Sequence, residues 1–233
     1  MELIKISSLC ECVKAKKDNA NAVYLAGGTE VLRLNSSIKA DSVIPVSSLI
    51  EKKIEAKGGE IFISSSVTFS DLLDSSIVPV ALKEACAYLS SRAIKNAATI
   101  GGNIASKRFD SYLIPTLLAY DAKLVVFSNE EKVCELKKYV KKNGCNCLII
   151  GILINPLIKV VNKRESLTSS THAAVTSALS EKGYFTAVSG GGIFMSLDEA
   201  LGATISDDIT GSGEYKKYLI KENYEILKEA LNG

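Results

Sequence analysis

The sequence is poor in the residue types that mark several specialised classes of protein. Its 233 residues contain no tryptophan, four prolines, two methionines and one histidine, and aromatic residues make up 6% of the chain. Collagen-like and low-complexity chains are excluded, because 47% of the residues are hydrophobic and 23% are charged. We therefore expect an ordinary globular protein that is long enough to bury a substantial core.

Long hydrophobic runs and an excess of charge of one sign are also missing. The longest apolar run, residues 148–154, has seven residues, whereas roughly twenty are needed to span a bilayer. No basic segment followed by an apolar stretch stands at residues 1–5, so no signal peptide is predicted. The net charge is +2, which gives no reason to expect nucleic acid or a membrane as partner. We expect a cytoplasmic protein.

The cysteines do not form a recognisable metal site. Cys10 and Cys12, and likewise Cys145 and Cys147, form C-x-C pairs. Metal sites more often use C-x2-C pairs supported by histidines, and the sequence has only His172. We therefore predict reduced thiols and no metal ligands.

Two glycine segments carry most of the functional signal. The first is Leu-Ala-Gly-Gly-Thr-Glu at 25–30, and the second is Thr-Ile-Gly-Gly-Asn-Ile-Ala at 99–105. Glycine pairs allow backbone N–H groups to converge into a nest that binds phosphate. Neither segment matches the dinucleotide-binding G-x-G-x-x-G pattern or the P-loop. Two nests in one chain predict one elongated anionic ligand held twice, and a dinucleotide has that shape.

Periodicity and turn residues predict an α+β fold, because strands and helices do not alternate strictly. A glycine pair at 58–59 predicts a hairpin, Ser70 is expected to cap a helix, and the Asn155–Pro156 step is the expected domain boundary. Helices are predicted at 9–17, from residue 30, and at 69–73, 79–89, 112–120, 171–180 and 214–231. Strands are predicted at 22–25, 42–46, 60–65, 122–127, 146–154, 157–163 and 184–188.

Taken together, the two glycine segments resemble the FAD-binding (medium) subunit of the molybdenum hydroxylases, the xanthine dehydrogenase and carbon monoxide dehydrogenase flavoprotein family. That family carries A-G-G-T-[DE] followed by T-[IV]-G-G-N-[IL]-A at about this separation. The resemblance runs from about residue 22 to 203. It implies a PCMH/VAO-like FAD-binding domain of two subdomains at 1–156, followed by a small α+β C-terminal domain with a short antiparallel sheet at 157–233.

The resemblance also implies which residues hold FAD. The backbone of residues 26–29 and the Thr29 hydroxyl would hold the pyrophosphate, Val31 would lie near the isoalloxazine ring, and Asn103 would offer an amide. Leu25 would contact the ligand through its backbone only. No catalytic residue is expected, because the flavin does the redox chemistry. The full predicted set is Leu25, Ala26, Gly27, Gly28, Thr29, Glu30, Val31, Thr99, Gly102, Asn103 and Asp110.

The chain departs from the family pattern after the second glycine segment. The family continues with a proline-containing segment that ends in Asp, whereas ungapped counting puts Tyr112 at that position and Asp110 two residues early. Asp110 either fills the family role or caps a helix that begins near Ser111. Lys107 and Arg108 either neutralise the pyrophosphate or face solvent.

Three features of the C-terminal part have weaker interpretations. The three glycines at 190–192 are predicted to be structural, at a strand edge where backbones approach closely. Lys163 or Arg164 is expected near the flavin ring. His172 is expected to be an ordinary residue of the 171–180 helix.

The implied function is electron transfer within a multi-subunit complex. Electrons would pass from [2Fe-2S] clusters on a small partner subunit to FAD, and then to NAD⁺ or another acceptor. A large subunit would carry the molybdenum cofactor. Two alternatives stay open: a freestanding flavin oxidoreductase, and a flavin-free paralogue that serves as an assembly module.

Overall fold

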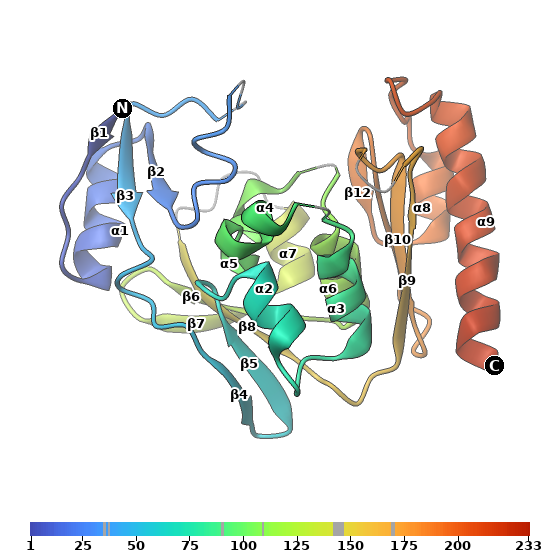
Figure 1. Ribbon diagram of the computed structural model, residues 1–233, viewed down its shortest axis with the longest axis horizontal. Helices are drawn as coiled ribbons and strands as arrows, with labels where there is room; N and C mark the ends of the chain where they lie inside the picture. Colours follow the sequence, from blue (N-terminus) through green and yellow to red (C-terminus); the bar gives the residue numbers. More distant parts are fainter. Residues whose placement is uncertain (35, 37, 90, 109, 142–146, 169–170) are drawn as a thin grey trace.

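Three sheets, each associated with helices, follow one another along the chain (Figure 1). The computed structural model describes residues 1–34, 36, 38–89, 91–108, 110–141, 147–168 and 171–233. Strands and helices do not alternate strictly along the chain, and the two larger sheets are antiparallel, which confirms the predicted α+β class.

The N-terminal sheet is small and parallel. Its strands are β1 (Glu2–Leu3), β2 (Ala22–Leu25) and β3 (Ser42–Pro45), in the order β1-β3-β2. Helix α1 (Leu9–Asp18) connects β1 to β2, and the Ser8 side chain caps it by accepting a hydrogen bond from the Glu11 N–H. Cys12, Val13 and Ile44 belong to the core between helix and sheet. The strand β2 leads directly into the first glycine segment.

The predicted helix from residue 30 is wrong. In the structure this stretch is a turn, closed by a hydrogen bond of 2.9 Å from the Leu32 N–H to the Gly28 carbonyl. The side chains of Leu32 and Leu34 are exposed. The apolar residues after Glu30 therefore have no core to pack against, and a helix gets most of its stability from such packing.

The middle sheet has five antiparallel strands in the order β4-β5-β8-β6-β7. Their bounds are β4 Ile54–Lys57, β5 Glu60–Ser64, β6 Lys123–Phe127, β7 Glu131–Glu135 and β8 Leu148–Ile154. As predicted, Gly58 and Gly59 join β4 to β5, both with positive φ. The accompanying helices are α2 (Phe69–Asp74), α3 (Val80–Ala87), α4 (Arg92–Ala97), α5 (Ile100–Ser106), α6 (Leu113–Ala119) and α7 (Leu136–Lys141).

Two of these helices connect parts of the fold. Helix α2 begins with a capping box of Thr68 and Asp71, so the prediction that Ser70 caps it is wrong. Every residue of α6 is buried, and α6 packs against the C-terminal sheet. The Thr186 hydroxyl donates to the Pro115 carbonyl across this contact, at 2.7 Å.

The C-terminal sheet is antiparallel, in the order β12-β11-β10-β9, and α9 covers its outer face (Figure 1). The elements are β9 Val160–Glu165, β10 Val175–Ser180, β11 Phe185–Ser189, β12 Gly192–Phe194, α8 Leu197–Gly202 and α9 Gly213–Asn232. The predicted helix at 171–180 is wrong, because this segment contains β10. All residues of β10 are buried, between α9 on one face and α6 on the other. A strand buried on both faces lacks the polar alternation that distinguishes it from a helix.

The predicted domain boundary at Asn155–Pro156 stays a prediction. The chain leaves the middle sheet at Ile154 and enters the C-terminal sheet at Val160. The hydrophobic core of the middle part extends to Ala178 and Val188 of the C-terminal sheet. Within the described ranges, no helix has the length and apolar character needed to cross a membrane.

Candidate functional site

A cavity of about 300 Å³ is lined by both glycine segments. This volume lies at the lower end of the range for small-molecule sites. Most of the predicted site residues belong to its wall, but Leu25 and Asp110 do not. The predicted residues that line it are Ala26, Gly27, Gly28, Thr29, Glu30, Val31, Thr99, Gly102 and Asn103.

The first glycine segment packs directly on the chain that leads into the second. A Cβ atom at Gly27 would lie 1.7 Å from the Ala97 carbonyl oxygen, so only glycine fits there. Gly28 has a φ of +72°, which disfavours other residues. These two glycines let a segment that follows β2 lie against the end of α4, although about seventy residues separate the two glycine segments.

The first glycine segment offers a row of unused backbone donors. Within the part of the chain that the structure describes, the N–H groups of residues 26–31 donate to no acceptor, whereas the Leu32 N–H closes the turn. All six of these residues line the cavity. The residues of this row are half-buried, with Gly27 exposed, so their N–H groups can bind water or a ligand in the cavity. A run of free N–H groups at a cavity is an anion-binding arrangement.

The second glycine segment forms the first turn of α5, and its backbone donors are already used. The Gly101 N–H donates to the Ser65 carbonyl at 3.0 Å, the Gly102 N–H to the Thr99 hydroxyl at 3.1 Å, and the Asn103 N–H to the Thr99 carbonyl at 3.0 Å. The expected second nest of free N–H groups is therefore wrong. Glycine is needed at 101 because a Cβ would lie 2.4 Å from that of Ser65.

The side chain of Asn103 remains available to a ligand. Its Oδ1 accepts a hydrogen bond of 2.7 Å from the Ser111 hydroxyl, which fixes the orientation of the amide. Its NH₂ group has no partner among the described residues. The Ser111 hydroxyl also accepts from the Ile114 N–H at the start of α6. Asp110 therefore does not cap that helix, and the capping alternative is wrong.

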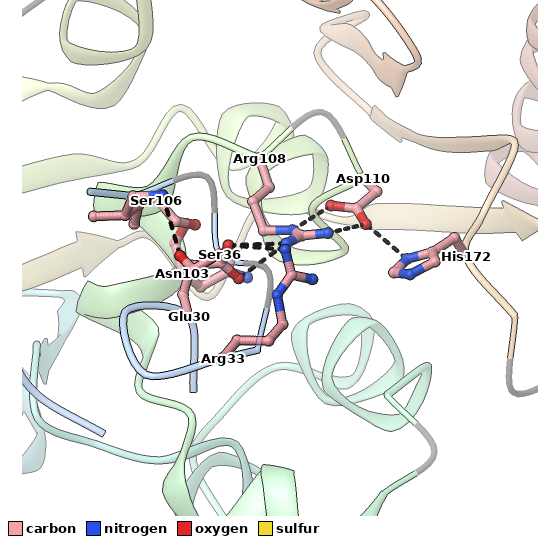
Figure 2. A network of polar contacts seen from close by, with 9 residues as sticks. Glu30, Arg33, Ser36, Asn103, Ser106, Arg108, Asp110 and His172 are labelled. Carbon is pink, nitrogen blue, oxygen red and sulfur yellow. Dashed lines mark hydrogen bonds and ion pairs between the residues drawn. The ribbon is translucent and has the colours of Figure 1, made fainter. Parts of the chain in front are cut away.

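A network of polar contacts connects the first glycine segment to the C-terminal part of the chain (Figure 2). Arg108 Nη1 donates to both carboxylate oxygens of Glu30, at 3.0 and 2.9 Å. Its Nε and Nη2 donate to the two oxygens of Asp110, each at 2.6 Å. His172 Nδ1 lies 2.8 Å from Asp110 Oδ2, and Arg33 Nη2 lies 3.3 Å from Glu30 Oε1.

The charges of this network largely balance one another. Burial alone would raise the pKa of Asp110, but the hydrogen bonds and charge of Arg108, together with His172, hold it below the ordinary value. Hydrogen bonding to Asp110 is the main cause that raises the pKa of Arg108, so the guanidinium of Arg108 stays protonated. Arg108 is partly buried and lines the cavity. Its charge faces two carboxylates. The sequence predicted either that Arg108 faces solvent or that it neutralises the pyrophosphate, and it did not predict these pairs.

Other candidate residues have structural partners. Lys107 Nζ donates to the Tyr139 carbonyl at 2.9 Å and lies 4.5 Å from the centroid of the Tyr139 ring. Lys163 pairs with Glu165, and Arg164 stacks 5.3 Å from the Tyr112 ring. Neither Lys163 nor Arg164 lines the cavity.

The glycines at 190–192 pack closely, as predicted. A Cβ at Gly190 would lie 2.7 Å from Asp208 Oδ2 and 3.0 Å from the Nζ of Lys216. Lys216 is fully buried and pairs with Asp208 at 2.7 Å. This part of the chain is therefore a packed corner of the fold.

The prediction of reduced thiols is only partly confirmed. Free thiols are found at Cys10, Cys12, Cys86 and Cys134, whereas Cys147, in the cavity wall, is disulfide-bonded. Burial raises the pKa of Cys86 to about 12. Cys145 lies outside the described residues. Among the described residues, no cluster of three or more His, Cys, Asp or Glu side chains is suited to hold a metal ion.

Sequence reasoning missed the contact between Asp110 and His172 altogether. The expected helical setting of His172 is wrong, since His172 lies in the segment before β10 and its ring reaches Asp110. Sixty-two residues separate the two in sequence, and a contact of that kind leaves no periodic pattern. The one available signal was the departure from the family pattern after the second glycine segment.

A family model described as the FAD binding domain in molybdopterin dehydrogenase matches residues 1–155. The uncharacterized protein YgfM of Escherichia coli K12 is 30% identical over 161 residues, which cover 68% of this chain and 60% of YgfM. The xanthine dehydrogenase FAD-binding subunit of Escherichia coli O157:H7 is 33% identical over 131 residues, which cover 53% of this chain and 45% of that subunit. The matches therefore span less than two thirds of these relatives.

Solved structures share the fold over nearly the whole chain. Carbon monoxide dehydrogenase from Hydrogenophaga pseudoflava matches with a TM-score of 0.84 at 17% identity, covering 98% of this chain and 97% of that chain. Quinoline 2-oxidoreductase from Pseudomonas putida 86 matches with a TM-score of 0.82 at 15% identity, covering 97% and 95%. These two proteins therefore share the overall fold of this chain.

Proposed function

The chain belongs to the family of FAD-binding domains of molybdopterin dehydrogenases, the FAD-binding medium subunits of molybdenum hydroxylases, and on this premise we propose that it holds FAD in the cavity between its glycine segments. One observation carries the proposal. The N–H groups of residues 26–31 are unused and line the cavity. A pyrophosphate supplies the acceptors that such a row requires.

The residues of the cavity fit parts of FAD. The N–H groups of residues 26–29 and the Thr29 hydroxyl would hold the pyrophosphate, and Val31 would lie near the ring system. Leu25, which does not line the cavity, acts only as the end of β2 from which this segment starts, and Glu30 keeps its carboxylate paired with Arg108. The Asn103 amide makes the second contact, whereas Thr99 acts by capping α5 and so placing Gly102 and Asn103. Asp110 acts through Arg108 rather than by touching FAD.

We assign residues 1–156 to the FAD-binding domain and residues 157–233 to a C-terminal domain. The match of the family model to residues 1–155 supports this division. The change of sheet between Ile154 and Val160 falls at the same place.

FAD, when bound, supplies the redox centre that accepts and passes on electrons. In this proposal the electrons come from [2Fe-2S] clusters on a small partner subunit and leave to NAD⁺ or another acceptor. A large partner subunit carries the molybdenum cofactor, and the complex works in the cytoplasm. The relative named as a xanthine dehydrogenase FAD-binding subunit supports this assignment.

Purification from the native cells tests the partners. A tagged copy of the chain is expected to bring down stoichiometric iron and molybdenum, measured by elemental analysis, together with FAD. FAD without either metal would contradict the multi-subunit assignment and favour a freestanding flavoprotein. A tagged chain with an alanine at Gly27, which is expected to lose FAD, controls for adventitious flavin.

The acceptor is tested separately with the loaded chain. The bound FAD is reduced chemically under anaerobic conditions and mixed with NAD⁺. Return of the visible absorption of oxidised flavin is expected if NAD⁺ is the acceptor. Absence of that return, with rapid return on addition of a quinone or oxygen, would exclude NAD⁺ as the acceptor of this subunit.

A further inference from the structure

We propose that Arg108 is a positioning residue for FAD, which holds the first glycine segment at the cavity through Glu30 and is itself held by Asp110, which in turn contacts His172. The inference rests on the proposed function, since it concerns the same cavity. It assigns a role to the part of the chain that departs from the family pattern.

The first glycine segment needs an external support. Because the N–H groups of residues 26–31 have no acceptor among the described residues, the segment is not fixed by its own backbone donors. Besides the turn bond from the Leu32 N–H to the Gly28 carbonyl and the pairing of Arg33 with Glu30, two contacts with residues 97 and 108 restrain it. One is the close packing of Gly27 on Ala97. The other is the pair of hydrogen bonds that Arg108 Nη1 donates to the two oxygens of the Glu30 carboxylate. Glu30 lies inside the row of free donors, so a restraint on its side chain is transmitted to them.

Arg108 is suited to hold Glu30 in one orientation. A guanidinium is planar and presents its donors in a rigid fork, so two carboxylates bound to it have a defined relative geometry. Here Asp110 occupies one edge of the fork at 2.6 Å and Glu30 binds Nη1. The side chains of Arg108, Glu30 and Asp110 are 26%, 20% and 22% exposed, so solvent screens these pairs less than surface pairs.

The loop after α5 fixes both sides of the cavity. Arg108 reaches the first glycine segment, and Ser111, three residues later, orients the Asn103 amide of the second. His172 anchors the outer end of this arrangement from the C-terminal part of the chain, at 2.8 Å from Asp110 (Figure 2). The position of the C-terminal segment is thereby linked to the geometry of the cofactor cavity.

If the network served only to balance charge, the effect of Glu30→Gln on FAD affinity would be opposite to the effect that a positioning role predicts. In Glu30→Gln, a negative charge next to the proposed pyrophosphate site is removed while Arg108 stays. If the network only tuned the net charge of the cavity, FAD would bind more tightly. If Arg108 positions the segment, FAD binds more weakly, because an amide oxygen replaces a carboxylate that accepts two charge-assisted bonds.

The experiment measures the FAD dissociation constant and the unfolding midpoint of the FAD-free full chain for six proteins. They are the wild type, Arg108→Met, Arg108→Lys, Glu30→Gln, the double variant of Glu30→Gln with Arg108→Met, and a control, Arg92→Met. Arg92 is exposed in α4 and does not line the cavity. We expect the FAD dissociation constant to rise at least roughly ten-fold in R108M and in E30Q, and by a smaller factor in R108K. The control is expected to keep the wild-type constant. The double variant E30Q with R108M is expected to bind no more weakly than R108M alone.

The outcomes are separable. A wild type that binds no FAD would overturn the proposed function itself. A wild type that binds FAD, with R108M within two-fold of it, would overturn the positioning role, even if the unfolding midpoint of R108M falls. Tighter binding by E30Q would also overturn it, in favour of charge balance. If R108M does not fold, the weaker binding of E30Q and R108K at an unchanged unfolding midpoint supports the proposal.

Discussion

Replacement of Gly27 by alanine is expected to abolish tight FAD binding. The added Cβ would lie 1.7 Å from the Ala97 carbonyl oxygen and 2.6 Å from its carbon. To restore even a tight contact of 3.0 Å, the two segments must separate by about 1.3 Å. The neighbour is backbone just before α5, so it cannot rotate away as a flexible side chain would. The first glycine segment must therefore move relative to the second.

The size of the effect follows from the contacts that are lost. Overpacking of this kind costs about 1–3 kcal/mol of folding stability. A hydrogen bond to a charged group contributes about 1.5–3 kcal/mol, so the loss of one N–H contact to the pyrophosphate weakens binding roughly 10- to 100-fold. We expect the dissociation constant for FAD to rise by at least that factor, with a lower unfolding midpoint.

Flavin fluorescence during titration of the FAD-free protein measures this constant, and circular dichroism follows unfolding. Gly202→Ala is the matched control, because no atom lies within 4 Å of its added Cβ and its φ is not positive. That variant is expected to bind FAD normally and to be as stable as the wild type or slightly more stable. Unchanged FAD binding by Gly27→Ala would refute the placement of the cofactor at this turn.

Three further predictions concern stability and thiol chemistry. Thr68→Ala removes the capping box with Asp71 and is expected to lower the free energy of unfolding by about 1 kcal/mol in urea titrations, without affecting FAD binding. Because the pKa of Asp110 is lowered below 3.8, its ion pairs stabilise the fold above that pH and lose this effect as the pH falls through the lowered pKa. The unfolding midpoints of wild type and Asp110→Asn should therefore differ at neutral pH, and the difference should shrink only as the pH falls below the ordinary pKa of an aspartate and through the lowered one; a constant difference would contradict this. In the native protein an alkylating reagent should modify the exposed Cys10 well before the buried Cys86, as read by peptide mass spectrometry; equal rates would show that the α3 core opens readily.

The sequence allowed the fold class and the location of the cavity to be predicted, because both depend on local signals. Glycine pairs mark the turns, and alternation or buried apolar runs mark most of the strands. The predictions were wrong where packing against distant parts of the chain determines the secondary structure. Residues 175–180 form a strand because α6 and α9 cover both faces. The residues after Glu30 stay a turn because the side chain of Leu32 is largely exposed and belongs to no hydrophobic core among the described residues.

The chemistry of the two glycine segments could not be told apart from sequence. Both contain Gly-Gly followed by a polar residue, yet only the first leaves its N–H groups unused. In the second, the glycine at 101 serves close packing on Ser65, and the N–H groups belong to the cap of α5. Likewise, the link between Arg108, Asp110 and His172 depends on side chains from distant parts of the chain.

Hydrogen exchange of backbone N–H groups tests the central claim most directly. The full chain is exchanged with and without saturating FAD, and protection is read for peptides or single amides. The account predicts strong slowing at residues 26–31 on addition of FAD, and little change at Gly101 and Gly102, whose N–H groups are already bonded. Saturating FAD that leaves exchange at residues 26–31 unchanged would contradict it.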